Sequence, residues 1–424
     1  MSFHIITLGC KINQYESQSI SESLVARGME QVSRPALARE IIINSCAVTS
    51  RAVRDLKKTC RRAARLNPGA RIIVTGCAAQ VLEKELSGLR EVHKVIPQKD
   101  KALLPGVLMP AQGRAEDTAD YSISDYFRAR AVVKVQDGCS HRCTYCIVPL
   151  TRGKSRSRTP SMILDEILRL LDRGFKEITL GGINLRLFGR DLSPEMDFWD
   201  LLVYLDKNLQ AGVKDNFRIR LSSLEPSELG NKALETIAGS SMLCPHLHIS
   251  LQSGSRSVLG RMNRGHYDPR DLINFSRSLD KIWPLYSMGA DILAGFPGES
   301  RRDFEQTLEL VQSLPLSYAH IFPYSLRPGT PAADFSGQVP EREKKSRAGL
   351  LKSLIHSRKQ EFVKRAARED RLDIVMETRT RGMSEYYVEC LLEKNFSSKP
   401  RQRIQARPLR VEDEKLIVRP CHDL

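Results

Sequence analysis

Short apolar runs alternate with amphipathic segments of helical length over the first hundred residues. Three such runs predict strands, at 5–8, 41–43 and 72–74. A helix between the first two extends to about Arg27 and is closed by Gly28, and a second helix at 51–66 is stopped by the Asn67-Pro68-Gly69 turn. Strands separated by helices of this length pair in parallel, so the pattern predicts an α/β fold with a doubly wound sheet.

The same alternation resumes, over a longer span, after about residue 125. Six apolar runs predict strands there, at 131–135, 178–180, 217–221, 246–251, 287–293 and 320–324. Between the first two, Thr159-Pro160 starts a helix that ends before Gly174. The apolar face of that helix is expected to consist of Ile163, Ile167, Leu168 and Leu171. Six strand–helix repeats predict a partial (β/α)6 barrel with its ligand site at the carboxyl ends of the strands.

After the predicted barrel, the sequence pattern changes first to a charged helix and then to short strands. Residues 341–368 read as a long charged helix, and the stretches 372–376, 386–392 and 416–418 read as short strands of a small β-domain. The whole pattern predicts four parts, after a linker at 106–125 is set aside. They are an α/β domain at 1–110, a partial barrel at 126–345, a connecting helix at 346–364 and a β-domain at 365–424.

Composition narrows the class of protein. Of the 424 residues, 41% are hydrophobic and 27% are charged, as in ordinary globular proteins. No apolar run approaches the roughly 18 residues of a membrane span, and the start of the chain does not resemble a signal peptide, so a cytoplasmic protein without a membrane partner is expected. The net charge of +16 favours a polyanionic partner such as RNA.

Ten cysteines in a cytoplasmic chain indicate metal or redox chemistry rather than disulfides. Cys139, Cys143 and Cys146 have the C-x-x-x-C-x-x-C spacing that can bind three irons of a [4Fe–4S] cluster and leave the fourth open to S-adenosylmethionine. Tyr145 would then lie near the adenine of that cofactor. The alternative is a zinc site, but zinc motifs usually pair two short hairpins of Cys or His, and no second C-x-x-C lies nearby.

Three further cysteines follow the three N-terminal strands, one after each. Because carboxyl ends of parallel strands share one edge of a sheet, Cys10, Cys46 and Cys77 are expected to converge there and to form a second cluster site. The alternative is coincidence, since core cysteines are common. Cys60, Cys244, Cys390 and Cys421 are interpreted as ordinary thiols.

Several segments together resemble the radical-SAM methylthiotransferase family, and the likeness runs the length of the chain. They are Gly9-Cys10-Lys11-Ile12-Asn13-Gln14, Asn44-Ser45-Cys46, Thr75-Gly76-Cys77, Gly138-Cys139 to Cys146, His246-Leu247-His248 to Ser255, and Gly295-Phe296-Pro297-Gly298-Glu299. The resemblance implies an N-terminal cluster domain, a radical-SAM partial barrel and a C-terminal TRAM-like domain that binds RNA.

The first segment, with Arg220 to Pro226, is most similar to the branch that modifies threonylcarbamoyladenosine beside the tRNA anticodon. The alternatives are the branch acting on isopentenyladenosine in tRNA, the branch acting on a ribosomal-protein aspartate, and a non-catalytic Fe–S protein that binds RNA. The resemblance implies two [4Fe–4S] clusters, S-adenosylmethionine and an electron donor of flavodoxin or ferredoxin type. It leaves the sulfur donor open and assigns no acid or base residue.

The resemblance also suggests cofactor contacts at the ends of the barrel strands. These are Gly181, Gln252, Ser253, Gly295 and Pro297. Asn13 is expected either to reach the second cluster or the substrate base, or to cap the helix that follows it. Arg152 is expected to pair with a substrate carboxylate or phosphate, or else to form a surface ion pair.

Two basic segments are candidates for binding RNA. Four cations recur at helical spacing after Cys46, namely Arg51, Arg54, Lys58 and Arg61. Arg401 and Arg403 belong to a basic stretch near the C-terminus. Runs of this kind are more often solvated faces than binding sites, and the position beside the second cysteine set is what favours the first one.

Overall fold

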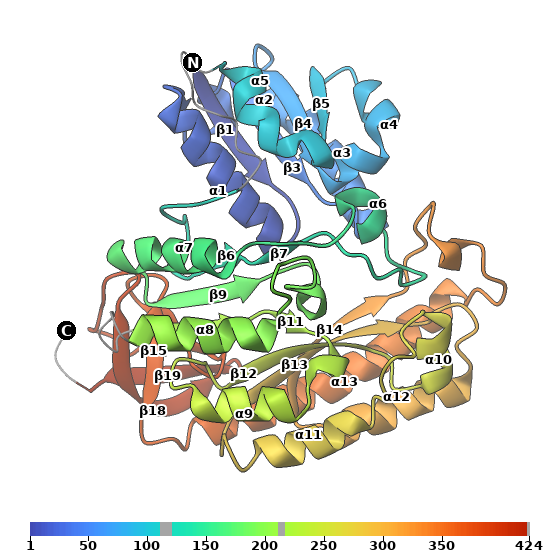
Figure 1. Cartoon of the computed structure of the whole chain (residues 1–424), viewed down its shortest axis with the longest axis vertical. Coiled ribbons are helices and arrows are strands. Elements are labelled where there is room, and N and C mark those ends of the chain that lie inside the picture. The colour runs from blue at the N-terminus through green and yellow to red at the C-terminus, as the bar shows by residue number, and fades with distance from the viewer. Residues whose placement is uncertain (111–120, 211–216, 422–424) are drawn as a thin grey trace. The chain divides into compact units, whose positions relative to one another are not determined.

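A computed structural model describes residues 1–110, 121–210 and 217–421 of the chain (Figure 1). It has two compact units. Unit 1 comprises residues 1–126, 137–156 and 325–333, and unit 2 comprises 127–136, 157–324 and 334–424. The cysteine loop at 139–146 therefore belongs to the same unit as the N-terminal domain. Two-residue strands β7 (Gln136–Asp137) and β8 (Arg156–Ser157) lie where the chain passes between the units.

Unit 1 is built on a parallel sheet in the order β2-β1-β3-β4-β5. The strands are β1 (Ser2–Thr7), β2 (Glu30–Gln31), β3 (Glu40–Ser45), β4 (Arg71–Gly76) and β5 (Lys94–Pro97). The helices are α1 (Lys11–Ala26), α2 (Ser50–Leu66), α3 (Cys77–Val81), α4 (Glu83–Ser87), α5 (Leu104–Leu108) and α6 (Val148–Arg152). The three predicted strands are confirmed. β2 and β5 were not predicted, because β2 is short and exposed and β5 contains only one buried residue.

Both faces of this sheet are covered, as a doubly wound fold requires. Ile41 and Val74 point into a core that α2 completes with Leu56 and Cys60. The neighbouring residue Ile42 points to the other face, whose core includes α1. Strand positions therefore alternate between two apolar cores, which explains why these strands are apolar throughout. Predicted linker residues 106–108 are helical, and 111–120 lie outside the described residues.

Unit 2 contains the predicted partial barrel. Its parallel strands are β6 (Ala131–Lys134), β9 (Glu177–Gly181), β10 (Arg218–Leu221), β11 (Ser223–Leu224), β12 (His246–Gln252), β13 (Ser287–Ala294) and β14 (Leu316–Pro323). They form the orders β10-β9-β6 and β11-β12-β13-β14, and β10 and β11 are separated by a single residue. All six predicted strands are present. The last strand begins at Leu316, before the predicted start at His320. The prediction missed these first residues because Ser317 and Tyr318 interrupt the apolar run.

The helices of the barrel follow its strands. They are α7 (Pro160–Asp172), α8 (Phe198–Gln210), α9 (Asn231–Gly239), α10 (Arg256–Arg261), α11 (Asp271–Leu279), α12 (Arg301–Ser313) and α13 (Glu341–Ala366). The Thr159 hydroxyl caps α7 by accepting the Met162 N–H at 3.4 Å. The face of α7 that is buried includes Leu170 and Glu166, and the predicted Leu168 and Leu171 are only partly buried. Glu166 is buried because Arg158 pairs with it at 2.9 Å, a contact that hydrophobic spacing cannot predict.

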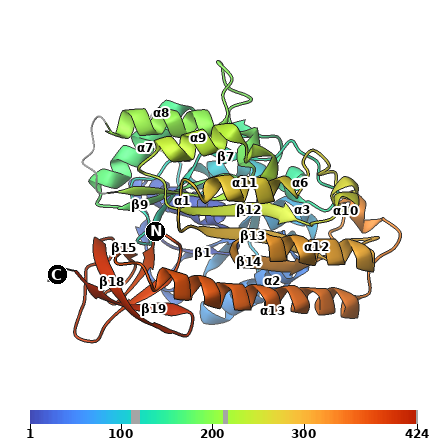
Figure 2. The same ribbon diagram turned by 90° about the horizontal axis from the view of Figure 1, so that it is seen from below.

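The chain ends in a closed five-stranded barrel with the order β15-β16-β17-β19-β18. Its strands are β15 (Leu372–Met376), β16 (Arg381–Ser384), β17 (Glu389–Leu392), β18 (Arg403–Glu412) and β19 (Lys415–Pro420). The predicted strand at 386–392 is a turn followed by β17. β18 was missed because Arg403, Arg407 and Arg410 make its sequence look like a basic loop. Figure 2 shows this barrel at one end of α13, which packs along β14.

An ion network in unit 2 joins the C-terminal barrel to the β9–β10 part of the sheet. The buried Glu177 carboxylate accepts the Nε hydrogens of Arg218 at 2.8 Å and Arg220 at 2.7 Å. Both guanidinium groups also donate to backbone carbonyls of the C-terminal barrel, including those of Asp373 at 2.6 Å and Ser384 at 3.0 Å. The partial barrel and the C-terminal barrel are therefore held together by buried charges that share hydrogen bonds.

Glu385, beside this network, makes the stability of the chain depend on pH. Burial, only partly offset by Arg218, raises the pKa of Glu385 to about 7. Between pH 4.5 and 7 the folded chain thus binds more protons at this site than the unfolded chain, so its contribution to stability falls as pH rises. Glu385→Gln should raise the free energy of unfolding by about 2 kcal/mol at pH 8 and by little at pH 5. Thermal unfolding across this pH range checks it, and a difference that does not vary with pH would contradict it.

The described helices include none with both the length and the apolar composition needed to cross a membrane.

Candidate functional site

The structure brings Cys10, Cys46 and Cys77 together at one edge of the unit 1 sheet. Cys10 follows β1, Cys46 follows β3 and Cys77 begins α3 directly after β4, and these three strands are neighbours. The Cys46 thiol lies within electrostatic reach of both other thiols. Convergence of cysteines that are distant in sequence is what the parallel order of the strands predicts.

Two glycines allow the cysteine loops to approach one another. Gly9 and Gly76 have φ angles of +102° and +94°, which side chains rarely permit. A Cβ on Gly9 would lie 2.7 Å from Cys46 Cβ, and one on Gly76 would lie 2.6 Å from the Ser45 nitrogen. The residues before Cys10 and Cys77 must therefore be glycine for the three thiols to meet.

Asn13 ties two of these loops together. Its side chain is buried and donates to the carbonyls of Leu8 and Ser45, both at 2.9 Å. It does not cap α1, whose N-cap residue is Cys10 and has no side-chain capping bond. Asn13 therefore fixes the segments that lead into Cys10 and Cys46.

Arg152 connects this arrangement to the loop that carries Cys139, Cys143 and Cys146. It ends α6, which follows the cysteine loop, and its guanidinium donates to Asn13 at 2.6 Å, Glu16 at 2.9 Å and Asp137 at 2.8 Å. The side chain is 1% exposed, so both expectations for it, a substrate partner and a surface ion pair, are wrong. Although burial opposes it, Glu16 and Asp137 hold the pKa of Arg152 well above its usual value.

The surroundings of the first three thiols suit a metal cluster. Burial raises the pKa of the Cys46 thiol to about 11, and a bound metal ion would favour its thiolate form. Positive charge is supplied nearby, since Arg152 and Lys101 lie within electrostatic reach of Cys77, and Arg327 within that of Cys46. Three converging cysteines, two glycines that admit close approach and buried cations fit an iron–sulfur cluster carrying thiolate charge.

The other three thiols occupy a compact loop of the same unit. Cys139 is buried and Cys143 and Cys146 are half-buried. The Cys146 N–H donates to the Cys143 carbonyl at 3.0 Å, and the Cys139 N–H donates to the Gly153 carbonyl at 3.0 Å. This tight turn also fits a cluster held by three thiolates. Tyr145 is half-buried within the loop, and its place beside the cofactor adenine stays a prediction.

The predicted cofactor contacts lie at strand ends of unit 2. Gly181 ends β9, Gln252 ends β12 with a φ of +60°, and Gly295 follows β13 with a φ of +75°. Pro297 is buried in the loop after β13. Ser253 is 2% exposed, and its hydroxyl contacts Thr307 at 3.3 Å and accepts the Ser255 N–H, so its side chain holds the loop to α12. The roles of all five in cofactor binding stay predictions.

Glu299 organises one of these loops and was not assigned to it from sequence. Its carboxylate accepts the Phe296 N–H at 3.0 Å and the Gly295 N–H, and pairs with Arg347 at 3.4 Å. The signal was present, because a carboxylate closing a glycine-proline turn is a natural acceptor for its free N–H groups.

A polar chain on β12, β13 and β14 was missed entirely. Asp291 Oδ1 is 3.0 Å from His248 Nε2 and 3.2 Å from His320 Nδ1. The Tyr318 hydroxyl lies 3.0 Å from His248 Nδ1 and 2.7 Å from His246 Nε2. Despite burial, the two hydrogen-bonded histidines hold the pKa of Asp291 well below its usual range. Ligand atoms, one each from His248, Asp291 and His320, also lie within 4.8 Å of one another, the spacing of a candidate cation site. Period-two spacing of His and Tyr within predicted strands was the available signal.

The predicted basic segments differ in what they offer. Arg51, Arg54, Lys58 and Arg61 are exposed along one face of α2. Arg403 is instead bound to both carboxylate oxygens of Asp373 and to the Phe217 carbonyl, and the Arg401 guanidinium lies 3.9 Å from the centre of the Phe175 ring. The C-terminal pair therefore stabilises the fold, and the α2 face remains the better candidate for binding phosphate.

Family models match most of the chain in two segments. A family described as uncharacterized protein family UPF0004 matches residues 2–97, and the radical SAM superfamily matches residues 133–311. A threonylcarbamoyladenosine tRNA methylthiotransferase MtaB from Rickettsia prowazekii is 36% identical over 92% of this chain and 91% of its own length. A tRNA-2-methylthio-N(6)-dimethylallyladenosine synthase from Clostridium botulinum is 34% identical over 84% of this chain and 81% of its own length. The chain belongs to the radical-SAM methylthiotransferase family.

This methylthiotransferase is thus an enzyme that uses S-adenosylmethionine and two [4Fe–4S] clusters. The two cysteine sets of unit 1 are the residues that fit the clusters. Its fold is also found in the radical S-adenosylmethionine methyltransferase TsrM from Kitasatospora setae. That structure has a TM-score of 0.57 at 14% identity and covers 78% of this chain and 77% of TsrM.

Proposed function

We propose that this enzyme inserts a methylthio group at carbon-2 of N6-threonylcarbamoyladenosine, next to the anticodon of tRNA. The observation that carries the proposal is the pair of cysteine triplets in one compact unit, in a chain that aligns almost end to end with relatives of that name. Those relatives include a second MtaB, from Aquifex aeolicus, at 34% identity over 90% of this chain and 94% of its own length.

The proposed division of labour follows from the two sites. Cys139, Cys143 and Cys146 would hold the cluster that binds and cleaves S-adenosylmethionine, and the other three cysteines would hold the cluster that carries the sulfur. The clusters and cofactor supply radical chemistry, which an aromatic C–H requires because no side-chain base can remove its proton. The protein's own residues keep the loops in place, with Arg152 and Asn13 bridging the two sets.

The choice of nucleoside has chemical support in unit 2. Threonylcarbamoyladenosine carries a carboxylate, whereas the dimethylallyl group is apolar. Arg186 lies in the short segment Leu185–Leu187 that follows β9 and contacts β11, at the carboxyl ends of the strands. Arg186 is partly buried, and Glu228 lies within its electrostatic reach. Among the described residues its guanidinium forms no ion pair. A guanidinium in such a position suits a carboxylate ligand.

Substrate choice can be tested directly with two anticodon stem-loop RNAs that differ only in the modified adenosine. The reconstituted full-length enzyme should convert the threonylcarbamoyl RNA to its methylthio product at least about ten times faster than the dimethylallyl RNA, because it would lose its carboxylate contact with the second. Mass spectrometry of the digested RNA measures both products. Equal rates, or a preference for the dimethylallyl RNA, would show that the branch is wrong.

Several partners follow from this function. The tRNA would contact the exposed basic face of α2, where Arg54 and Lys58 would bind phosphates. An electron donor of flavodoxin or ferredoxin type would reduce the cluster that cleaves the cofactor. We infer that the enzyme works in the cytoplasm, where its RNA substrate is found.

A further inference from the structure

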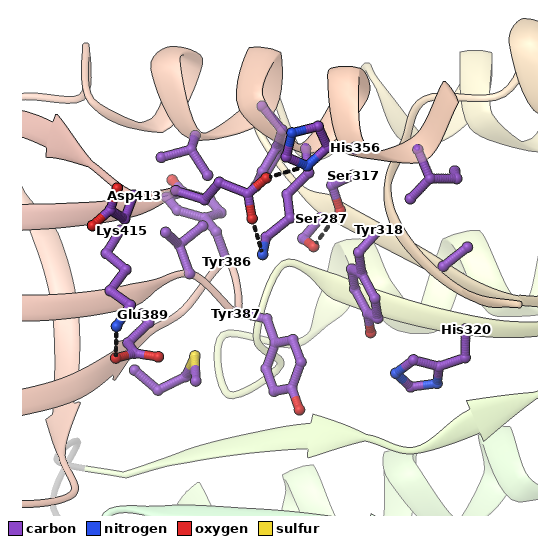
Figure 3. Close-up of a pocket in the computed structure, with 18 of the residues that line it drawn as sticks. Ser287, Ser317, Tyr318, His320, His356, Tyr386, Tyr387, Glu389, Asp413 and Lys415 are labelled. Atoms are coloured by element: carbon purple, nitrogen blue, oxygen red, sulfur yellow. Dashed lines mark hydrogen bonds and ion pairs between the residues drawn. The ribbon is translucent and has the colours of Figure 1, made fainter. Parts of the chain in front are cut away.

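A row of aromatic rings follows β14 in unit 2. Tyr318, His320 and Phe322 alternate along the strand and therefore project from the same face. Ring centres are 5.8 Å apart between Tyr318 and His320 and 6.3 Å apart between His320 and Phe322. Tyr387 of the C-terminal barrel extends the row, with its ring centre 5.6 Å from that of Tyr318. Figure 3 shows Tyr387, Tyr318 and His320 side by side along one side of a pocket.

The inner end of this row is held rigidly. Tyr387 has a φ of +61°, which is uncommon outside glycine, and its ring lies beneath the guanidinium groups of Arg220 at 5.2 Å and Arg130 at 5.6 Å. The Tyr318 hydroxyl is fixed by hydrogen bonds to His246 and His248. Rings held in this way present a surface that needs little further ordering when a ligand stacks on it.

The outer end of the row is open. The His320 side chain is 59% exposed and Phe322 is 43% exposed. Asp291 orients the exposed imidazole through its Nδ1 atom. An exposed phenyl ring and an oriented imidazole at the end of a barrel strand suit a ligand with a planar ring that can stack on them.

The pocket beside the row has the size and lining of a nucleotide site. Its volume is about 510 Å³, within the range of small-molecule pockets, and it lies between β14, α13 and the C-terminal barrel. Most of its charges are already paired, since Lys359 and His356 bind Glu414 and Lys415 binds Glu389. Lys352 also lines it and is exposed, and within the described part of the chain its amino group has no ion-pair partner.

We propose that Tyr387, Tyr318, His320 and Phe322 form a stacking track for unpaired nucleotides that flank the modified adenosine. The track runs along β14 from the C-terminal barrel toward the carboxyl ends of the barrel strands, the end at which β/α barrels bind their ligands. Unpaired bases stack on aromatic rings without regard to sequence, and the net charge of +16 favours such a polyanion. Lys352 supplies a phosphate contact beside it. The proposal rests on RNA being the substrate.

Phe322 offers the sharpest test, because shape and stacking can be separated there. Phe322→Leu keeps an apolar side chain without a π face, and Phe322→Tyr keeps the ring. With the full-length enzyme and an anticodon stem-loop RNA, Phe322→Leu should weaken the Kd about ten-fold, and Phe322→Tyr should change it less than about two-fold. At position 320, His320→Phe should retain more affinity than His320→Ala. Phe127→Leu is the matched control, since Phe127 is 59% exposed and lies outside the track.

Three further measurements test whether the ligand is unpaired RNA. A fully paired duplex of the same length should bind the intact enzyme and Phe322→Leu equally, because its bases are unavailable. A 2-aminopurine placed in the loop should be quenched on binding to the intact enzyme and less so with Phe322→Leu. Lys352→Gln should reduce the slope of log Kd against log salt by about 0.7, the value for one phosphate contact on a single strand.

The outcomes separate this proposal from the proposed function. If the intact enzyme modifies threonylcarbamoyladenosine while Phe322→Leu and His320→Ala bind the stem-loop as tightly as Phe127→Leu does, the track is wrong and the function stands. If the RNA binds with the expected pattern but is never methylthiolated, the function is wrong and the track stands. Absence of any stem-loop binding by the intact enzyme overturns the track as well.

Discussion

Cys143→Ala is expected to abolish methylthio insertion and cleavage of S-adenosylmethionine together. Three thiolates would hold each cluster in the proposed arrangement, and a [4Fe–4S] cluster that loses one of three protein ligands is not retained in a form that can bind the cofactor. The variant should also lose about half of the bound iron, because the cluster on the other three cysteines does not depend on this one. Iron analysis and the yield of 5′-deoxyadenosine after reduction measure both effects.

Cys46→Ala should separate the two activities. It would remove a proposed ligand of the second cluster, so methylthio insertion should be lost with about half of the iron, while cleavage of S-adenosylmethionine continues. Cys421→Ala is the control, because Cys421 is only partly buried and belongs to neither triplet. If Cys46→Ala retained full iron and methylthio product, the assignment of the second cluster would be wrong.

Arg152→Met is expected to destabilise unit 1 strongly. The Arg152 side chain is 1% exposed, and its loss leaves Glu16 and Asp137 without the guanidinium that pairs with them. Removing one partner from such a buried network typically costs about 3–5 kcal/mol. Because Arg152 also holds Asn13, the loops of both cysteine sets should loosen and cluster occupancy should fall.

Thermal unfolding of the intact protein and of Arg152→Met, each with its iron content, checks this expectation. Arg156→Met is the matched control, since Arg156 belongs to the same unit and is exposed. Arg152→Lys should recover only part of the loss, because an ammonium cannot reproduce the forked contacts of the guanidinium. An Arg152→Met protein that unfolds like Arg156→Met would show that the buried network contributes little.

Much of the fold follows from patterns local in the sequence. Apolar runs such as Ile41–Ile43, separated by helices, imply parallel strands, and parallel strands place Cys10, Cys46 and Cys77 at one edge. Strand β18 escaped prediction because it carries three arginines and only Ile404 and Ala406 among its residues are buried. Local pattern is informative when burial and strand order agree, and less so where charged side chains line a strand.

The parts of the site that could not be predicted depend on contacts between distant residues. Arg152 and Glu16 are separated by 136 positions, and nothing near either one indicates the other. Asp291, His248 and His320 come from three different strands whose register is set only when the barrel forms. The spacing of Cys139 and Cys146, by contrast, predicts a cluster site from residues of one loop.

The most direct test of the central claim is mass spectrometry of tRNA nucleosides from cells that lack this chain, beside the same cells carrying the intact or the Cys143→Ala protein. Methylthio-threonylcarbamoyladenosine should vanish without the chain, return with the intact protein and stay absent with Cys143→Ala. If that nucleoside were unchanged by loss of the chain, the proposed substrate would be wrong, and isopentenyladenosine and ribosomal-protein targets would be examined in its place.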